Sequence, residues 1–383
     1  MMNILVVAHY QGDGSPTAIF VHEQIRAFVE AGHQVKVIVP IALGKRDWNN
    51  HRFGVCVKRI MIDQIEHNFL RYLSLSSIGE NGFNGWSARS ALGCQLGKVM
   101  GTFIPDIIHA HTIGLDSKIG AWLKKKYHCP LVVTTHGSDT SIPLAKGKKD
   151  FLKRCCDQAD TIVAVSSILA NKLKQCNTAT PICSILNGFN IQYIPSDYRK
   201  KELSFIQVGH LIPQKKVDVT IRAFAQIQQR YPNATLLIVG SGSERSALET
   251  LCHELRIDAS VCFMGQVPNQ VVLEEMAKSQ FFIMPSIREG FGIVYMEAMA
   301  TGCITIGTEG EGIADLIVSG ENGLLVPPND PDAIVCRIME CLNNPKKAEA
   351  IAKRGREDAI MLTWGKNISC YTKVFVSLIE RMQ

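Results

Sequence analysis

Short apolar runs alternate with amphipathic stretches along the whole chain. In the first half, residues 3–10 and 34–40 are apolar and rich in β-branched side chains, and residues 18–32 between them place apolar positions at helical spacing. The same order returns in the second half, where the apolar run 204–211 precedes the helical pattern 217–232. Strands that alternate with helices in this way predict an α/β protein with parallel, doubly wound sheets.

The segment between the two halves is polar and mixed, and it carries turn-forming Asn-Gly and Pro residues. A chain of 383 residues is also longer than a single core usually serves. We therefore predict an N-terminal Rossmann-like domain over residues 1–190, a C-terminal Rossmann-like domain over 191–365, and a final helix over 366–383 that packs back on the first domain. Because ligands bind beyond the carboxyl ends of the strands in such sheets, we expect the site in the cleft between the domains.

The composition is that of a globular protein, with 46% hydrophobic and 20% charged residues. No apolar run reaches the roughly 18 residues that a membrane span needs, and the first run lacks the basic start of a signal peptide. The thirteen cysteines include no Cys-x-x-Cys pair, and Cys262 and Cys303 lie in apolar runs. These features predict a cytoplasmic protein with free, buried thiols and neither disulfides nor a metal site.

The net charge of +6 is unevenly distributed, because two basic blocks lie in the first half, at 124–126 and 146–154. They are either solvated helix surfaces or a surface that meets anionic lipid or an anionic acceptor. Few aromatic residues are interleaved with the lysines, which argues against nucleic acid as a partner.

A glycine and two lysines follow the first strand predicted in the second half. Gly209 and His210 end that strand, and Lys215 and Lys216 follow within the same loop. Such a loop either binds a phosphate group, through lysine charge and backbone N–H groups, or is a solvated connection. Two other glycine-rich loops, which begin at residues 11 and 240, lack the third glycine of a dinucleotide fingerprint. The loop at 240 indicates a tight strand-to-helix turn, whereas Gly12 and Gly14 in the loop at 11 would still let a phosphate or sugar come close.

Two carboxylates bracket a further glycine-rich turn, in the sequence EGFGIVYME over residues 289–297. Glu289 lies on a loop after a predicted strand, and Glu297 lies one turn into the next helix, where side chains lean toward the helix start. The N–H groups of residues 291–293 face the same space, and the helix dipole favours an anion there. Two carboxylates that can accept hydrogen bonds from vicinal hydroxyls, on either side of an anion site, indicate a binding site for a sugar nucleotide. The two carboxylates alone would also be compatible with the acid/base pair of a hydrolase.

Histidines and an aspartate follow two strands predicted in the first half. His109 and His111 lie at the end of one strand, and His136 and Asp139 follow the other. No cysteine or glutamate stands beside them in the sequence, so a metal site is not indicated. They are either strand-end structural residues or, as neutral imidazoles, hydrogen-bonding partners for substrate hydroxyls.

The ordered set of motifs resembles the family 4 retaining glycosyltransferases of the GT-B fold, over nearly the whole chain. EGFGIVYME matches the EX7E motif of that family, VGHLIPQKKVD resembles its phosphate-binding pattern, and LIVGSG, FMGQV and ENGLLVPP follow in the expected order. FVHEQIRAF, DIIHAH, THGSD and ILNGFN resemble its first-domain and linker elements. The resemblance implies that a sugar moves with retention from a nucleotide diphosphate sugar, which we expect to be UDP-linked, to a glycan or polyprenyl-diphosphate-linked acceptor. The basic blocks favour the polyprenyl-diphosphate-linked acceptor, which would give a role in cell-surface polysaccharide synthesis at the cytoplasmic face of the membrane. We expect the reaction to need no metal or other cofactor.

The resemblance also implies a role for each site residue. Lys215 would pair with the donor diphosphate, Glu297 would bind the ribose hydroxyls, and Glu289 would bind hydroxyls of the donor sugar. His136, Lys215 and Glu289 would be catalytic, and His111 and Asp139 would lie on the acceptor side. The implied donor-binding residues are Gly14, Gly209, His210, Lys215, Lys216, Val267 through its backbone near the base, Glu289, Gly290, Phe291, Gly292, Ile293, Val294 and Glu297.

One departure from the family pattern concerns the diphosphate. His210 stands where the family usually has arginine, and Lys216 replaces the following glycine. Histidine is only partly charged near neutral pH, so Lys216 is hypothesised to compensate. The alternative functions are a nucleotide-sugar epimerase or phosphorylase of the same fold and a non-catalytic, sugar-nucleotide-binding protein of the membrane surface.

Overall fold

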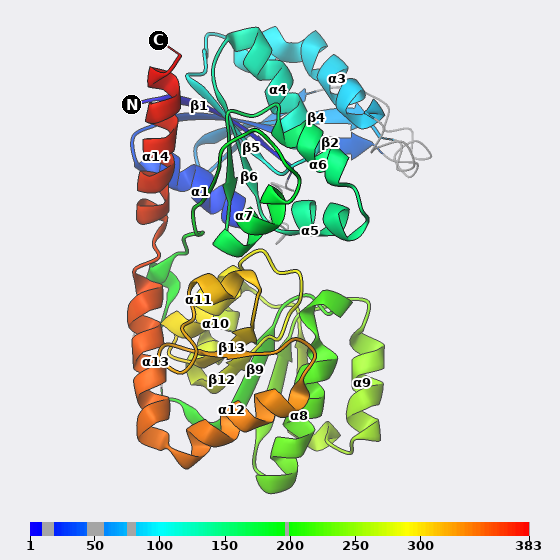
Figure 1. Ribbon diagram of the computed structural model, residues 1–383, viewed down its shortest axis with the longest axis vertical. Helices are drawn as coiled ribbons and strands as arrows, with labels where there is room; N and C mark the ends of the chain where they lie inside the picture. Colours follow the sequence, from blue (N-terminus) through cyan, green and yellow to red (C-terminus); the bar gives the residue numbers. More distant parts are fainter. Residues whose placement is uncertain (10–18, 44–56, 75–81, 196–198, 383) are drawn as a thin grey trace. The chain divides into compact units, whose positions relative to one another are not determined.

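The computed structural model describes residues 1–9, 19–43, 57–74, 82–195 and 199–382, and it divides into two compact units (Figure 1). The first unit consists of Met1–Asn187 together with Trp364–Gln383, and the second consists of Gly188–Thr363. The divisions thus fall after residues 187 and 363, where the sequence interpretation placed them after 190 and 365. The final helix belongs to the first unit although it follows the second in the sequence.

The first unit is built on an eight-stranded sheet with the order β3-β4-β2-β1-β5-β6-β7-β8. Every neighbouring pair is parallel except β3 and β4, which form an antiparallel hairpin at the edge. Asp63 and Gln64 form its turn with positive φ angles of 48° and 63°, and without the glycine that usually marks such a turn in a sequence. The strands are β1 (Asn3–Ala8), β2 (Gln34–Leu43), β3 (Val57–Ile62), β4 (Ile65–Leu73), β5 (Ile107–His111), β6 (Leu131–Thr135), β7 (Thr161–Ala164) and β8 (Ile182–Ser184).

Helices cover both faces of this sheet, with α3 and α4 on one face and α1 and α14 on the other (Figure 1). Phe28 of α1 stacks on Phe375 of α14 with ring centroids 5.6 Å apart, and Gln24 donates a hydrogen bond to Asn367. These buried contacts hold the final helix on the first unit. The helices are α1 (Ile19–Glu30), α3 (Phe83–Met100), α4 (Leu115–Tyr127), α5 (Ser138–Ala145), α6 (Lys149–Cys156), α7 (Ser167–Lys174) and α14 (Trp364–Glu380).

The second unit is built on a six-stranded, wholly parallel sheet with the order β11-β10-β9-β12-β13-β14, as predicted for a doubly wound plan. From β9, the first strand of this unit in the sequence, the chain continues to β10 and β11 on one side of it and then returns to its other side as β12. The strands are β9 (Lys201–Val208), β10 (Thr235–Val239), β11 (Val261–Gly265), β12 (Ser279–Ile283), β13 (Ile304–Thr308) and β14 (Leu324–Val326). The helices are α8 (Val217–Arg230), α9 (Arg245–Glu254), α10 (Asn269–Lys278), α11 (Ile293–Ala300), α12 (Pro331–Asn343) and α13 (Pro345–Ile360).

Successive residues of the central strands are buried against opposite helical layers. Phe205 and Phe281 stack at 5.1 Å in the core shared with α8, whereas Phe282 meets Tyr295 of α11 at 5.7 Å on the other face. Because both faces are covered, the strands are near-continuous apolar runs, and polar chemistry is left to the loops at the strand ends. The carboxyl ends of the strands, including β9, β10, β11 and β12, lie together at one end of the sheet, because all the strands are parallel.

The twelve described cysteines are free thiols. Cys303 is buried as predicted, but the predicted burial of Cys262 is wrong, since β11 is an edge strand and leaves that side chain exposed. The helices that the structure describes include none with the length and apolar character to cross a membrane. Within the described residues, no group of three or more His, Cys, Asp and Glu side chains is placed to hold a metal ion.

Candidate functional site

The loop after β9 brings Lys215 back over the end of that strand. Gly209 has a φ of 151°, and a Cβ there would meet the methylene groups of Lys215 at 3.6 to 3.8 Å. A 3-10 turn, Pro213–Lys215, then leads to Lys216, which has a left-handed φ of 50° just before α8. Glycine adopts that conformation without strain, so a glycine suits position 216. A lysine there lowers the stability of the fold by about 1 kcal/mol through backbone strain. His210 is exposed on the same loop.

The loop after β12 carries Glu289 and is held by two neighbouring segments, the loop after β9 and the loop after β13. Ile287 donates a backbone hydrogen bond to Gln214 at 2.8 Å, and the N–H of Arg288 donates to Oε1 of Glu311 at 2.9 Å. Gly312 lies so close to Gly290 that a Cβ on it would come within 1.8 Å of the Gly290 carbonyl oxygen. These contacts hold the Glu289 loop beside the Lys215 loop.

Lys215 and Glu289 meet as an ion pair, although 74 residues separate them in the sequence. Their side chains are only 18% and 19% exposed. The pair forms where β9 and β12 lie side by side, which is the point at which the strand order reverses and where doubly wound sheets bind ligands.

Helix α11 begins directly after this loop. Gly292 has a φ of 80° and packs against Tyr295, whose hydroxyl donates to the carbonyl of Met284 at 2.6 Å. Within the described residues, the backbone N–H groups of residues 291–293 have no recorded protein acceptor. They can therefore serve an anion at the helix start, next to the buried Gly290 and the half-buried Val294.

Glu297 lies on α11 and accepts a hydrogen bond from Nδ2 of Asn269 at 3.3 Å. Asn269 opens α10, directly after the loop that contains the half-buried Val267. The structure thus links Glu297 to the loop after β11, whereas it links Glu289 to Lys215. Sequence reasoning missed Asn269, because an asparagine at the start of a helix is common and carries no signal of its own.

The glycines of the loop after β10 are required by close packing. A Cβ on Gly240 would lie 1.9 Å from the Gly209 carbonyl oxygen, and one on Gly242 would lie 2.2 Å from that of Leu211. This geometry confirms the prediction of a tight strand-to-helix turn, which here supports the loop of Gly209 and Lys215.

A cluster of three histidines lies at the carboxyl ends of β5 and β6 in the first unit, with His109 and His111 buried and His136 half-buried. Nδ1 of His111 and Nε2 of His136 are 3.2 Å apart, and Nε2 of His109 is 2.8 Å from Oγ1 of Thr134. Burial lowers the pKa of His109 to about 3 and that of His136 to about 4, and it also lowers the pKa of His111. The cluster is therefore neutral near pH 7 and can exchange hydrogen bonds with uncharged groups. The hydroxyl of Tyr371, from α14, lies 2.9 Å from Thr134 and completes this network.

Asp139 organises the loop that carries His136. Its Oδ1 accepts hydrogen bonds from Oγ1 of Thr135 and from the N–H groups of His136 and Gly137, at 2.9 to 3.1 Å. Its Oδ2 accepts from the N–H of Ile113 at 2.9 Å. Both oxygens are thus engaged inside the protein, and the assignment of Asp139 and His111 to the acceptor side stays a prediction.

Asp116 is a buried carboxyl that sequence reasoning missed. Its Oδ2 accepts hydrogen bonds from the N–H of His9 and from the hydroxyl of Thr112, and burial raises its pKa to about 8. No motif marks Asp116 in the sequence, because only tertiary packing encloses it. Gly14 lies outside the described residues.

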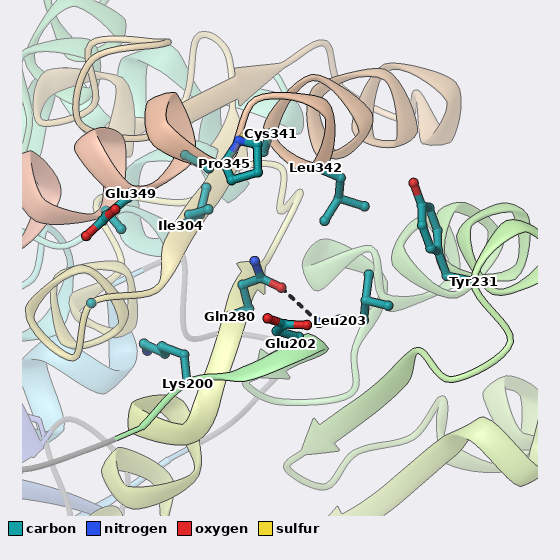
Figure 2. A pocket seen from close by; sticks show the side chains of 13 residues that line it. Lys200, Glu202, Leu203, Tyr231, Gln280, Ile304, Cys341, Leu342, Pro345 and Glu349 are labelled. Carbon is teal, nitrogen blue, oxygen red and sulfur yellow. Dashed lines mark hydrogen bonds between the residues drawn. The ribbon is translucent and has the colours of Figure 1, made fainter.

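A cavity of about 460 Å³ opens at the amino-terminal ends of the strands of the second sheet, opposite the loops described above (Figure 2). The side-chain oxygen of Gln280 accepts a hydrogen bond from the N–H of Leu203 on its floor, at 2.9 Å. Among the residues that the structure describes, no glycine-rich loop at a strand's carboxyl end lines this cavity, so we do not place the donor site there. The lining residues are Lys200, Glu202, Leu203, Tyr231, Gln280, Gly302, Ile304, Cys341, Leu342, Pro345, Ala348, Glu349 and Ala352.

Comparison with known proteins identifies the family. Residues 194–358 match the profile of the family described as Glycosyl transferases group 1, and residues 17–193 match that described as Glycosyltransferase Family 4. The chain is 30% identical over 278 residues to an uncharacterized glycosyltransferase of Methanocaldococcus jannaschii, a match that covers 72% of this chain and 76% of that one. It is 28% identical over 248 residues to a GDP-mannose-dependent monoacylated alpha-(1-6)-phosphatidylinositol monomannoside mannosyltransferase of Corynebacterium glutamicum, over 59% of this chain and 64% of that one.

A solved structure supports the fold. The Anabaena protein HepE, crystallised in complex with UDP-glucose, superposes with a TM-score of 0.76 over 99% of this chain and 100% of that one, at 19% identity. The two Rossmann-like units are thus those that the resemblance implied. The chain belongs to glycosyltransferase family 4, has the GT-B fold, and is a glycosyltransferase.

Proposed function

We propose that the protein transfers a sugar from a nucleoside diphosphate sugar to a hydroxyl group of an acceptor, with retention of the anomeric configuration. The observation that carries this proposal is the meeting of Lys215 and Glu289 beside the start of α11. A cation and free amides suit a diphosphate, and the two carboxylates suit sugar and ribose hydroxyls. The donor complex of HepE with UDP-glucose supports a UDP-sugar, whereas the name of the mannosyltransferase points to GDP-mannose as the competing donor.

The chemistry follows from the charge that develops as the diphosphate leaves. The bond from the anomeric carbon to the phosphate oxygen breaks, and negative charge grows on that oxygen while the sugar becomes oxocarbenium-like. Lys215 and the amides at residues 291–293 stabilise the departing charge, so we propose that the reaction needs no metal. The acceptor oxygen bonds to the anomeric carbon on the face that the diphosphate leaves, and the departing phosphate oxygen takes the proton of the acceptor hydroxyl.

The carboxylates and histidines hold the reactants in this proposal. Glu289 and Glu297 accept hydrogen bonds from hydroxyls of the donor, and neither acts as the general base. Neutral His136 hydrogen-bonds to the donor sugar, because its low pKa keeps it uncharged.

We further propose that the acceptor is a polyprenyl-diphosphate-linked glycan at the cytoplasmic face of a membrane, in cell-surface polysaccharide synthesis. The basic blocks on α4 and around α5 and α6 support this proposal. Lys124 and Lys153 are neutralised by Asp160 and Asp157, but Lys125, Lys126 and Lys149 are exposed. Exposed cations of this kind each add about 1 kcal/mol of attraction to an anionic surface. Sedimentation of the protein with anionic and with neutral lipid vesicles tests this attraction. If anionic vesicles carry no more protein into the pellet than neutral vesicles do, the attraction to an anionic membrane is refuted.

A donor screen tests the reaction. We would follow the release of nucleoside diphosphate from UDP-, GDP- and ADP-sugars, with and without lipid extract as acceptor, for the native protein, for Lys215→Ala and for the control Lys353→Ala, which removes an exposed lysine of α13. Loss of one charge-stabilising donor is expected to lower turnover by about 10² to 10³-fold in Lys215→Ala only. Equal turnover of Lys215→Ala and the native protein would refute the site. A changed sugar without released diphosphate would indicate the epimerase, and binding without any turnover would indicate the non-catalytic alternative.

A further inference from the structure

The ion pair between Lys215 and Glu289 joins two groups to which the proposed function gives different ligands. Lys215 is needed by the diphosphate, and Glu289 is needed by hydroxyls of the donor sugar. In the structure each group is the partner of the other, and both side chains are largely shielded from water. Within the described residues, Glu289 is the carboxylate in ion-pair contact with Lys215.

Both loops are shaped to bring this pair together. The alkyl chain of Lys215 passes Gly209, and Cγ of Glu289 lies 3.4 Å from the Cβ position of Gly292, so glycine backbone gives room on both sides. The hydrogen bond from Ile287 to Gln214 ties the two loops at 2.8 Å, close to both charged residues. The contact is therefore a built feature of the site and not a chance meeting of two surface side chains.

An incoming diphosphate must compete with the carboxylate for the same ammonium group. A phosphate oxygen that reaches Lys215 also comes close to Glu289, and two anions in a shielded site repel each other. Charged partners that lose their counter-ion in such a site are destabilised far more than they are at an exposed position. Binding of the diphosphate therefore depends on what replaces Lys215 as the partner of Glu289.

We propose that Glu289 is the resting counter-ion of Lys215 and that it makes the site discriminate between the donor and the spent nucleoside diphosphate. This inference rests on the proposed function. The sugar of an intact donor offers hydroxyl groups to the displaced carboxylate, which compensate it. A bare nucleoside diphosphate offers none, so Glu289 returns to Lys215 and opposes retention of the product.

The test compares the binding of bare and sugar-linked nucleotides. We would measure the affinity of UDP, GDP, UDP-glucose and GDP-mannose by calorimetry, in the presence of EDTA, for the native protein, Glu289→Gln, Lys215→Met and Glu309→Gln. Glu309→Gln removes an exposed carboxylate near the same sheet edge and controls for net charge.

Glu289→Gln is expected to bind the bare nucleoside diphosphate about tenfold more tightly, which is the effect of one shielded charge contact. The advantage of the sugar nucleotide over the bare nucleotide should shrink in the same variant, and Glu309→Gln should match the native protein. A merely structural role of Glu289 would weaken binding of both ligands and would not produce a gain.

Two outcomes separate this inference from the function on which it rests. If Lys215→Met weakens nucleotide binding but Glu289→Gln binds UDP and GDP no more tightly than the native protein, the counter-ion role is overturned and the donor site stands. If the native protein binds none of the four nucleotides, both are overturned.

Discussion

Gly312 offers a sharp test of how the Glu289 loop is positioned. A Cβ added to Gly312 would lie 1.8 Å from the carbonyl oxygen of Gly290, 2.5 Å from its carbonyl carbon and 2.9 Å from Cα of Phe291. Real Cβ atoms essentially never come closer than 3.0 Å. The atoms in the way are backbone atoms, which cannot swing aside as a flexible side chain can.

The size of the effect follows from this overlap. In Gly312→Ala, the segment that carries Glu289 and the amides at 291–293 must move by at least about 1.2 Å to relieve it, the difference between 3.0 and 1.8 Å. A displacement of about 1 Å at a reacting site lowers turnover by about 10²-fold. The overlap itself is expected to lower the free energy of unfolding by about 1–3 kcal/mol.

The assay is steady-state turnover of the best donor from the screen, together with urea unfolding of the same preparations. Gly310→Ala is the matched control, because Gly310 has a φ of 71° but no heavy atom within 4 Å of the added Cβ. It should lose about 1 kcal/mol of stability from backbone strain and keep its turnover. Native turnover and native nucleotide affinity in folded Gly312→Ala would refute the reasoning.

Three further predictions concern the first unit. Asp139→Asn should lower the free energy of unfolding by about 2–4 kcal/mol in urea, since an amide cannot replace a carboxylate that accepts four hydrogen bonds, and an unchanged midpoint would contradict this role. Tyr371→Phe should lose about 1 kcal/mol with the hydrogen bond to its buried hydroxyl, and a stability equal to the native one would show that this hydrogen bond does not help to hold α14. The lowered pKa values of His109, about 3, and His136, about 4, mean that the unfolded chain takes up these protons first, so stability present above pH 6.5 should be lost as the pH falls toward 4. The raised pKa of Asp116, about 8, acts in the opposite direction and offsets the histidines between pH 7 and 6. Urea melts at pH 7, 6, 5 and 4 should therefore show a net loss of about 1 kcal/mol or more from pH 6 to pH 5, and no loss in that interval would exclude a neutral histidine cluster.

Much of the fold follows from local sequence patterns. Parallel strands buried on both faces must be short apolar runs, and the helices between them must have one apolar side, so the alternation itself predicted two doubly wound sheets. The sequence did not predict the β3–β4 hairpin, because its turn places Asp63 and Gln64 at positive φ, where a glycine would have indicated the turn. The sequence also did not predict that Cys262 is exposed, because an apolar run does not indicate which strand lies at the edge of a sheet.

The candidate site divides in the same way. The sequence alone places Gly209, Lys215 and Glu289 at strand ends, since loops that bind phosphates and hydroxyls need glycine, lysine and acid at those points. The order of strands in the sheet places β9 beside β12. Because these two strands are neighbours, the loops that follow them bring Lys215 and Glu289 together as a shielded ion pair. Burial is a property of the packed structure, so the charge state of Asp116 and of the histidine cluster could not be read from the chain. Local spacing determined which groups are present, and tertiary packing decided which of them meet and which of them carry charge.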